Sequence, residues 1–322
     1  MEKIHFIMSN YSLIILSDFS KETRSAYLKQ HSRIADNSVA MSRFLKSFNT
    51  EYLGLDKDYF RNKKFLDAGC GNTGQLFINC HNMGCTDMTG LDLGVEFIEE
   101  TKKVLKKYNI PLENIQLDSG SVVNLPYDDN TFDFTSCNGV MLHLNNTDES
   151  EKAFAELVRV TKPGGLLYTV YGTVGGIYEG AINLWIRDYY RNNAEFKNII
   201  DNISPKTFSE LLSFISSEIE KHAGEKIDLS SFESLFDVDL CVTIQNVIQA
   251  PIRLTQELNQ EWVEKQCVKN MCEDLKRLQR YVKRENVRKF LAPFHFNKEH
   301  WVSRLLYGEG NLEFICRKKT VS

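Results

Sequence analysis

Short apolar runs alternate with amphipathic segments between residues 64 and 172. The apolar runs are bounded by glycine, proline or asparagine and predict buried strands at 64–68, 87–92, 114–117, 131–137 and 165–172. The intervening segments repeat apolar residues at helical spacing and predict helices at 73–83, 95–108 and 148–161. This alternation is typical of an α/β fold, in which helices cover both faces of a parallel sheet.

Outside this core the pattern is mainly helical. Apolar residues from Tyr27 to Phe48 recur at helical spacing and predict one helix over 21–48, with Ser20 as its N-cap. Downstream of the core, the pattern predicts helices at 176–192, at 205–222 and over most of 251–290, and strands at 236–248 and 311–317.

The overall composition is that of an ordinary globular protein. Of the 322 residues, 42% are hydrophobic and 25% are charged, which suffices for a sizeable core. No apolar run approaches the roughly 18 residues needed to span a bilayer. Polar residues at 9–12 interrupt the apolar N-terminal stretch and no small-residue cleavage site follows, so we expect a cytoplasmic protein.

Eight cysteines raise the question of disulfides or metal ligands. Only Cys80 and Cys85 form a tight cluster, and no second pair completes a four-ligand site. Cys267 and Cys272 are five residues apart in a predicted helix, which points their side chains away from each other. We therefore expect reduced thiols and no metal.

The net charge of −4 disfavours a polyanionic partner such as nucleic acid. One segment departs from that average, because seven lysines and arginines lie between Lys276 and Lys289 against the single acidic Glu285. This segment is either an anion-binding face, for a phosphorylated substrate or RNA, or a solvated helix surface.

A glycine-rich turn follows the first strand of the core. Gly69, Gly71 and Gly74 let the backbone approach a nucleotide, and the helix after them presents free N–H groups. Asp92 ends the next strand, eighteen residues after Gly74, where a carboxylate can accept hydrogen bonds from ribose hydroxyls. These features fit a nucleotide-binding turn, that of a nicotinamide enzyme included, and also a plain tight turn of an α/β domain.

Three further blocks follow this turn in the chain, namely Leu125-Pro126-Tyr127, Asn138-Gly139 and Lys162-Pro163-Gly164-Gly165. In their order and spacing, the four blocks resemble the class I S-adenosylmethionine-dependent methyltransferases, especially the small-molecule group of that superfamily. The resemblance covers about residues 60–175. It implies that the cofactor is S-adenosylmethionine.

The resemblance also implies a Rossmann-like sheet of seven mostly parallel strands with helices on both faces, whose last two strands form an antiparallel pair. The expected layout is an N-terminal helical cap (1–62), a cofactor-binding core (63–175), a helical insertion (176–230) and a C-terminal region (231–322) that carries the last strands and a helical insertion at 251–306. We expect both insertions to lie above the cofactor as a lid and acceptor pocket.

The resemblance places cofactor-binding residues at the ends of the strands. The methionine and ribose portions fall to Asp67, Gly69, Cys70, Gly71, Gly74, Asp92 and Leu93, and the sulfonium to Asn138 and Gly139. Where the family has an acidic residue for the adenine, this chain has Ser121, and the nearest carboxylate is Asp118. Either Ser121 contacts the adenine together with Gly120 and Val122, or a local shift brings Asp118 into range.

The acceptor side is less defined. His143 stands where many relatives have histidine, and it either accepts a proton from the acceptor or is structural. In related proteins a helix ahead of the core often folds over the cofactor, which makes Tyr27 and His31 candidates for the site or for plain packing. The other candidates for the acceptor pocket, each also explained by packing, are Tyr171, Tyr178, Trp185, Tyr189 and His295.

From these features we expect a methyltransferase that moves a methyl group by in-line displacement to a small-molecule acceptor. The alternatives are an RNA or protein methyltransferase, which only the basic segment favours, and a non-catalytic domain that binds the cofactor as a scaffold or sensor. A nicotinamide oxidoreductase is disfavoured, because hydride transfer has no use for the blocks at 125–127, 138–139 and 162–165.

Overall fold

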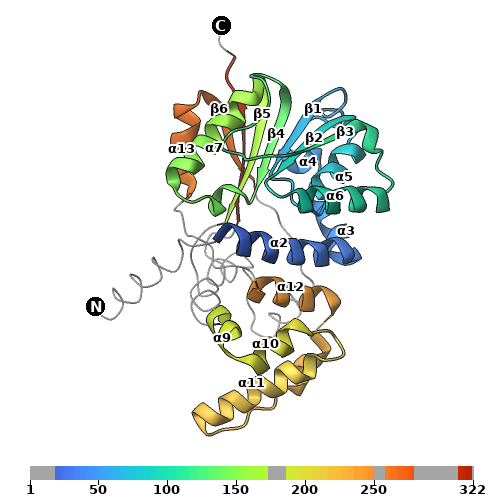
Figure 1. Ribbon diagram of the computed structural model, residues 1–322, viewed down its shortest axis with the longest axis vertical. Helices are drawn as coiled ribbons and strands as arrows, with labels where there is room; N and C mark the ends of the chain where they lie inside the picture. Colours follow the sequence, from blue (N-terminus) through green and yellow to red (C-terminus); the bar gives the residue numbers. More distant parts are fainter. Residues whose placement is uncertain (1–18, 173–185, 236, 250–257, 279–310, 321–322) are drawn as a thin grey trace, which may run out of the picture.

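A single seven-stranded sheet organises the chain. The computed structural model describes residues 19–172, 186–235, 237–249, 258–278 and 311–320. The strand order is β3-β2-β1-β4-β5-β7-β6, and neighbours are parallel except that β7 runs antiparallel to β5 and β6 (Figure 1). The predicted Rossmann-like sheet is confirmed. Its strands are β1 (Lys64–Ala68), β2 (Asp87–Asp92), β3 (Ile115–Ser119), β4 (Phe132–Asn138), β5 (Thr161–Gly172), β6 (Cys272–Leu278) and β7 (Asn311–Lys318).

Helices cover both faces of the sheet (Figure 1). Those on one face are α7 (Thr147–Val160) and α13 (Gln260–Lys269), and those on the other include α5 (Gln75–Asn82) and α6 (Val95–Lys107). In β5, Leu167 and Tyr171 are buried on the α7 face, whereas Tyr168 and Val170 are buried on the α5 face. Central strands that are buried on both faces give near-continuous apolar runs. Such runs mark β1 and β2, and the sequence predicts β1 to β4 within two residues of their observed bounds, although β3 lies at an edge of the sheet.

The N-terminal segment forms two main helices rather than the predicted single one. α2 (Phe19–Asp36) and α3 (Ser38–Ser47) are separated at Asn37, which is buried, and the short α4 (Thr50–Leu53) follows. Because α2 begins at Phe19, Ser20 lies within the helix, and its prediction as the N-cap was wrong. In Figure 1, α2 runs across one end of the sheet.

A separate helical layer lies beyond α2 (Figure 1). Its helices are α9 (Arg187–Asn192), α10 (Ala194–Asp201), α11 (Phe208–Ala223) and α12 (Val238–Gln249), with a 3-10 turn at Ser230–Leu235. They share a core of their own, to which α12 contributes Cys241 and Ile248. The predicted strand at 236–248 was wrong, because its β-branched residues lie on a helix that buries one face in this core. None of the helices in the described ranges combines the length and apolar character that a membrane crossing requires.

The strand β6 was also missed. Residues 272–278 were predicted as part of a helical insertion at 251–306, but they form the edge strand of the sheet and pair with β7. Edge strands often carry charged residues, and Glu273, Asp274, Lys276 and Arg277 hide the strand pattern here. Lys276 and Arg277 are the only cations of the basic segment that lie in the described part of the chain. They lie on this strand, not on the predicted helix.

Candidate functional site

A cavity of about 430 Å³ opens at the carboxyl ends of the parallel strands, where the strand order reverses between β1 and β4. Ligands of open α/β sheets bind at such a point. Residues from strand ends line one side of the cavity, and residues from α2 and α3 line the other. The lining residues are Arg24, Tyr27, His31, Ile34, Phe44, Asp67, Gly69, Cys70, Gly71, Thr73, Gln75, Leu76, Asp92, Leu93, Phe97, Gly120, Ser121, Val122, Asn138, Gly139, Val140, Leu142, His143, Leu144 and Val170.

The loop after β1 lines the cavity with two glycines, Gly69 and Gly71, together with Cys70 and Thr73. Gly69 has φ of +84°, and a Cβ placed on it would lie 2.2 Å from Cγ2 of Val140. A Cβ on Gly71 would lie 3.2 Å from Nδ1 of His31. Any larger residue at Gly69 would therefore collide with the cavity wall. Gly74 was expected in the cavity but does not line it; its free side faces Leu105 of α6 instead.

Asp67, at the end of β1, is a buried carboxylate in the cavity wall. Its side chain is 3% exposed, and its Oδ1 has no hydrogen-bond partner among the described residues. Burial raises the pKa of Asp67 to about 7. The neighbouring hydroxyl of Ser136 works against that rise, and the charge of Asp92 adds to it. A buried carboxyl oxygen with no partner is costly unless a donor or a cation approaches it.

Asp92, at the end of β2, holds the loop in place. Its Oδ2 accepts a hydrogen bond of 2.9 Å from the backbone N–H of Gly71, and its Oδ1 accepts one of 3.4 Å from that of Gly94. Burial raises the pKa of this carboxyl, against the lowering effect of these bonds and of Arg24. Each carboxylate oxygen can accept a second bond, so Asp92 can hold the loop and a ligand hydroxyl together. Leu93 follows it and is 54% exposed.

Of the two candidates for an adenine contact, only one lies at the cavity. Ser121 lines it together with Gly120 and Val122. Asp118 does not, and its Oδ2 accepts a hydrogen bond of 3.0 Å from the hydroxyl of Tyr127. The geometry therefore favours Ser121 over Asp118.

The end of β4 brings a histidine to the cavity. Asn138 and Gly139 line the floor, and the N–H of Gly139 donates to the carbonyl oxygen of Val170 at 3.0 Å. The short 3-10 helix Met141–His143 follows and places His143 in the lining. The ring of Tyr27 lies 4.9 Å from that of His143, measured between centroids.

The helix α2 closes the cavity from the opposite side. Tyr27 also packs against His31, at 5.4 Å between ring centroids. Nδ2 of Asn72, in the glycine loop, donates to the carbonyl oxygen of Leu28 at 3.1 Å and to Oγ of Ser32 at 3.0 Å. These bonds tie α2 to the loop. Burial lowers the pKa of His31 to about 4, so its imidazole is neutral at neutral pH.

Several predicted acceptor residues lie elsewhere. Tyr171 is fully buried on the α7 face of β5, against Trp262 and Phe314, because strand alternation points it away from the face that carries Val170. Tyr189 of α9 is absent from the cavity lining, and its hydroxyl donates to Oε2 of Glu218 at 2.9 Å. The structure therefore does not bring these two residues to the cavity. Tyr178, Trp185 and His295 lie outside the described residues.

Two functional candidates were missed. Arg24 lines the cavity from α2 and forms an ion pair of 2.6 Å with Glu96, while Phe97 lines it from α6. A signal for Arg24 was present, because Arg24, Tyr27 and His31 follow helical spacing and so share one face of α2. Phe97 carried no comparable signal, since apolar helix residues usually serve packing.

Comparison with known proteins agrees with this geometry. The family described as a methyltransferase domain matches residues 66–169, the segment that carries the glycine loop and β1 to β5. Residues 66–169 are a class I S-adenosylmethionine-dependent methyltransferase domain.

Curated relatives share this methyltransferase domain. The demethylmenaquinone methyltransferase of Staphylococcus epidermidis is 36% identical over 108 residues, which are 33% of this chain and 42% of that protein. The protein of the same name from Staphylococcus carnosus is 28% identical over 165 residues, 51% of this chain and 58% of that protein. The matches thus cover about half the length of these relatives.

A solved structure shares the fold. It is that of PKMT2 from Rickettsia typhi in complex with AdoHcy, with a TM-score of 0.51 and 18% identity over 87% of this chain and 53% of that one. At this identity the likeness shows the fold alone.

The cofactor of this methyltransferase domain is S-adenosylmethionine, and the cavity residues fit it. The partnerless Oδ1 of Asp67 can accept from the cofactor's ammonium group, which would also favour the ionised carboxylate. The bare loop at Gly69 and Gly71 leaves room for a close approach. Asp92 has acceptor capacity left for ribose hydroxyls.

Proposed function

We propose that this chain is an S-adenosylmethionine-dependent methyltransferase that moves a methyl group by in-line displacement to a small-molecule acceptor. One observation carries the proposal: the cavity that holds the loop and carboxylates of the methyltransferase domain also holds Tyr27, His31 and His143. In this proposal, the cofactor site and the groups that position and deprotonate an acceptor share one cavity.

The proposed cofactor contacts follow the strand ends. Asp67 binds the ammonium group, Asp92 the ribose hydroxyls, and Ser121 with its neighbours the adenine. Main-chain carbonyls at Asn138 and Gly139 face the sulfonium. When bound, the cofactor supplies an activated methyl group, so the residues of the chain need chiefly to orient the acceptor and exclude water.

The cavity lining also contains apolar and aromatic side chains that can face an acceptor. Ile34, Phe44, Leu142 and Leu144 contribute apolar surface, and the ring of Tyr27 packs against the rings of both histidines. Such a lining suits a compact, partly apolar acceptor with one group that loses a proton. The staphylococcal relatives are named for a small-molecule acceptor, which supports this class without naming the acceptor of this chain.

His143 is the proposed base. A histidine can accept a proton near neutral pH, and the contact with Tyr27 fixes its ring against the acceptor space. His31 is a poorer base, because burial lowers its pKa to about 4. We assign it to positioning the acceptor.

The direct test is calorimetry with S-adenosylhomocysteine, followed by a turnover assay that detects this product with a panel of phenols, amines, carboxylic acids and thiols. The proposal predicts one cofactor site per chain and turnover with at least one acceptor class. Binding without turnover on any class would favour the scaffold or sensor alternative. Turnover on RNA or protein alone would reject a small-molecule acceptor.

A further inference from the structure

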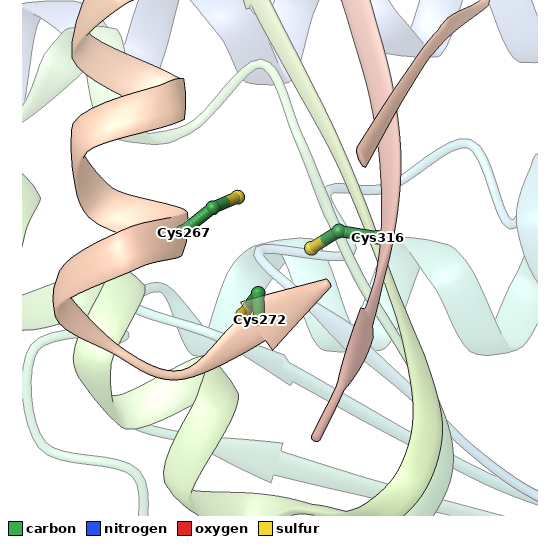
Figure 2. Close-up of side chains that lie close together, drawn as sticks. All are labelled: Cys267, Cys272 and Cys316. Carbon is green, nitrogen blue, oxygen red and sulfur yellow. The ribbon is translucent and has the colours of Figure 1, made fainter. Parts of the chain in front are cut away.

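Three cysteines that are distant in sequence meet in the core on the α7 face of the sheet. The Sγ atoms of Cys267, Cys272 and Cys316 all lie within 4.8 Å of one another. The side chains come from α13, β6 and β7 and gather in the space between them (Figure 2). Each residue is buried, with 4–7% of its surface exposed. None of the three lines the cofactor cavity.

The fold explains why they meet, although the sequence predicted that Cys267 and Cys272 point apart. That prediction was wrong, because the helix ends at Lys269 and the chain turns at Met271, with φ of +57°, into β6. Cys272 pairs with Lys318 of β7. Cys316 lies two residues before Lys318, on the same face of that strand, so both strand cysteines face α13.

The chemistry of the cluster suits a cation. The thiolate is the form of cysteine that binds a metal, so a bound cation displaces the thiol protons. Two cationic residues, Lys318 and Lys319, follow Cys316 closely in the chain.

We propose that Cys267, Cys272 and Cys316 bind a thiophilic metal ion of the Zn²⁺ type through three thiolates. Zn–S bonds of about 2.3 Å place tetrahedral sulfur ligands about 3.8 Å apart, so the three sulfurs need to move closer by no more than about 1 Å. Binding releases the thiol protons to solvent. Zn²⁺ with three thiolates carries one net negative charge, which Lys318 and Lys319 offset.

No fourth Cys, His, Asp or Glu joins this group in the described part of the chain. Among the described residues, the fourth tetrahedral position is left to solvent. Since the ligands come from α13, β6 and β7, the ion cross-links the helix to the edge of the sheet. The three sulfurs lie outside the cavity lining, so we expect the ion to act on stability and not on cofactor binding.

The test uses the full chain, reduced and stripped with a chelator. After addition of Zn²⁺ and gel filtration, elemental analysis is expected to find one ion per chain, and Co²⁺ is expected to give thiolate-to-metal charge-transfer bands. Cys267→Ala and Cys316→Ala should each weaken Zn²⁺ binding by at least about 100-fold. Loss of a residue that only supports a metal ligand already costs up to about 100-fold in affinity, and loss of the ligand itself costs at least as much. Cys241→Ala is the matched control, because Cys241 is equally buried but lies in the helical layer.

A second measurement uses only the wild-type chain and so does not depend on whether the variants fold. Zn²⁺ should slow alkylation of the three cysteines, mapped by peptide mass spectrometry, and leave Cys241 unchanged. The proposal is overturned if the reduced chain retains no metal, or if Zn²⁺ protects Cys241 as much as the three. It is also overturned if the freshly purified chain carries a disulfide within the trio that reduction does not convert into a metal site.

Discussion

The backbone N–H of Gly71 donates a 2.9 Å hydrogen bond to Oδ2 of Asp92. Through this bond the end of β2 fixes the loop that follows β1, so one carboxylate supports the shape of the cofactor loop and also faces the cavity. The contact therefore links the stability of the loop to the affinity for the cofactor.

Asp92→Ala should weaken S-adenosylhomocysteine binding by at least about tenfold and lower the free energy of unfolding by about 1–3 kcal/mol, because two backbone N–H groups lose their acceptor. Calorimetry and denaturant titration measure the two effects. Asp92→Asn, which keeps one acceptor oxygen, should be less affected. If Asp92→Ala binds like the wild type, the ribose assignment is wrong.

The pKa of Asp67 makes ligand-free stability depend on pH. The folded-state pKa is about 7, raised by burial from 3.8, so between these values the folded chain binds more protons than the unfolded chain. Its stability therefore falls as pH rises from about 4 to 7. Asp67→Asn removes this contribution and should be more stable than the wild type at pH 8, by roughly 1–3 kcal/mol.

Denaturant titrations of both proteins at pH 5 and pH 8, without cofactor, measure the difference. Asp67→Asn should also reduce the affinity for S-adenosylhomocysteine. In the wild type this affinity should rise between pH 6 and pH 8 as Asp67 loses its proton, and in Asp67→Asn it should rise less. A pH-independent stability difference would show that Asp67 does not titrate as described.

A comparison of Gly69→Ala with Gly164→Ala separates the cost of a side-chain collision from the cost of backbone strain. Both glycines have positive φ, at +84° and +77°, but only a Cβ at Gly69 meets another residue within 4 Å. Gly164→Ala should cost about 1–2 kcal/mol and leave cofactor binding intact. Gly69→Ala should cost more and abolish binding. Adding Val140→Ala to it should restore part of the stability, and no recovery would argue against the predicted collision.

Ser121→Leu should reduce S-adenosylhomocysteine affinity by about tenfold or more, because a large side chain would fill the cavity beside Gly120. Asp118→Asn is the control, since Asp118 bonds Tyr127 outside the cavity lining. Equilibrium binding of both variants decides the adenine contact. A loss of affinity confined to Asp118→Asn would reverse the assignment.

His143→Gln should lower turnover about 100-fold or more while changing cofactor affinity by less than about twofold, as expected for a general base. His31→Gln should raise the acceptor KM without altering the pH profile of kcat, because His31 stays neutral above its pKa of about 4. Steady-state kinetics over pH 5–9 distinguish the two roles. An unchanged pH profile in His143→Gln would make His143 structural.

The part of the fold that the sequence predicts is the part whose burial leaves a simple pattern. β1 and β2 carry short buried runs with clear boundaries, and the residues at the ends of the parallel strands meet because these strands end at one edge of the sheet. In contrast, β6 is an edge strand whose charges mask its alternation, and α12 is rich in β-branched residues. For both segments, burial in the folded protein determines whether a strand or a helix forms. Local residue preferences do not reveal that burial.

The site shows the same division. Asp67 and Asp92 lie at the cavity, where the ends of their strands place them. Tyr171 lies on the opposite face of the sheet, because the face of a strand residue depends on register. The cysteine trio was missed for a related reason. Its members meet only through the pairing of β6 with β7, which no spacing along the chain reveals.

The helix α2 lies between the glycine loop and the helical layer, bonded to the loop through Asn72 and to α12 through Arg33 and Gln249. One face of this helix lines the cavity, and the helix also contacts α12, whose residues are absent from the cavity lining. A new acceptor could therefore be accommodated in evolution by exchanging side chains along a single helix, while the ends of the strands, and with them the donor chemistry, stay as they are.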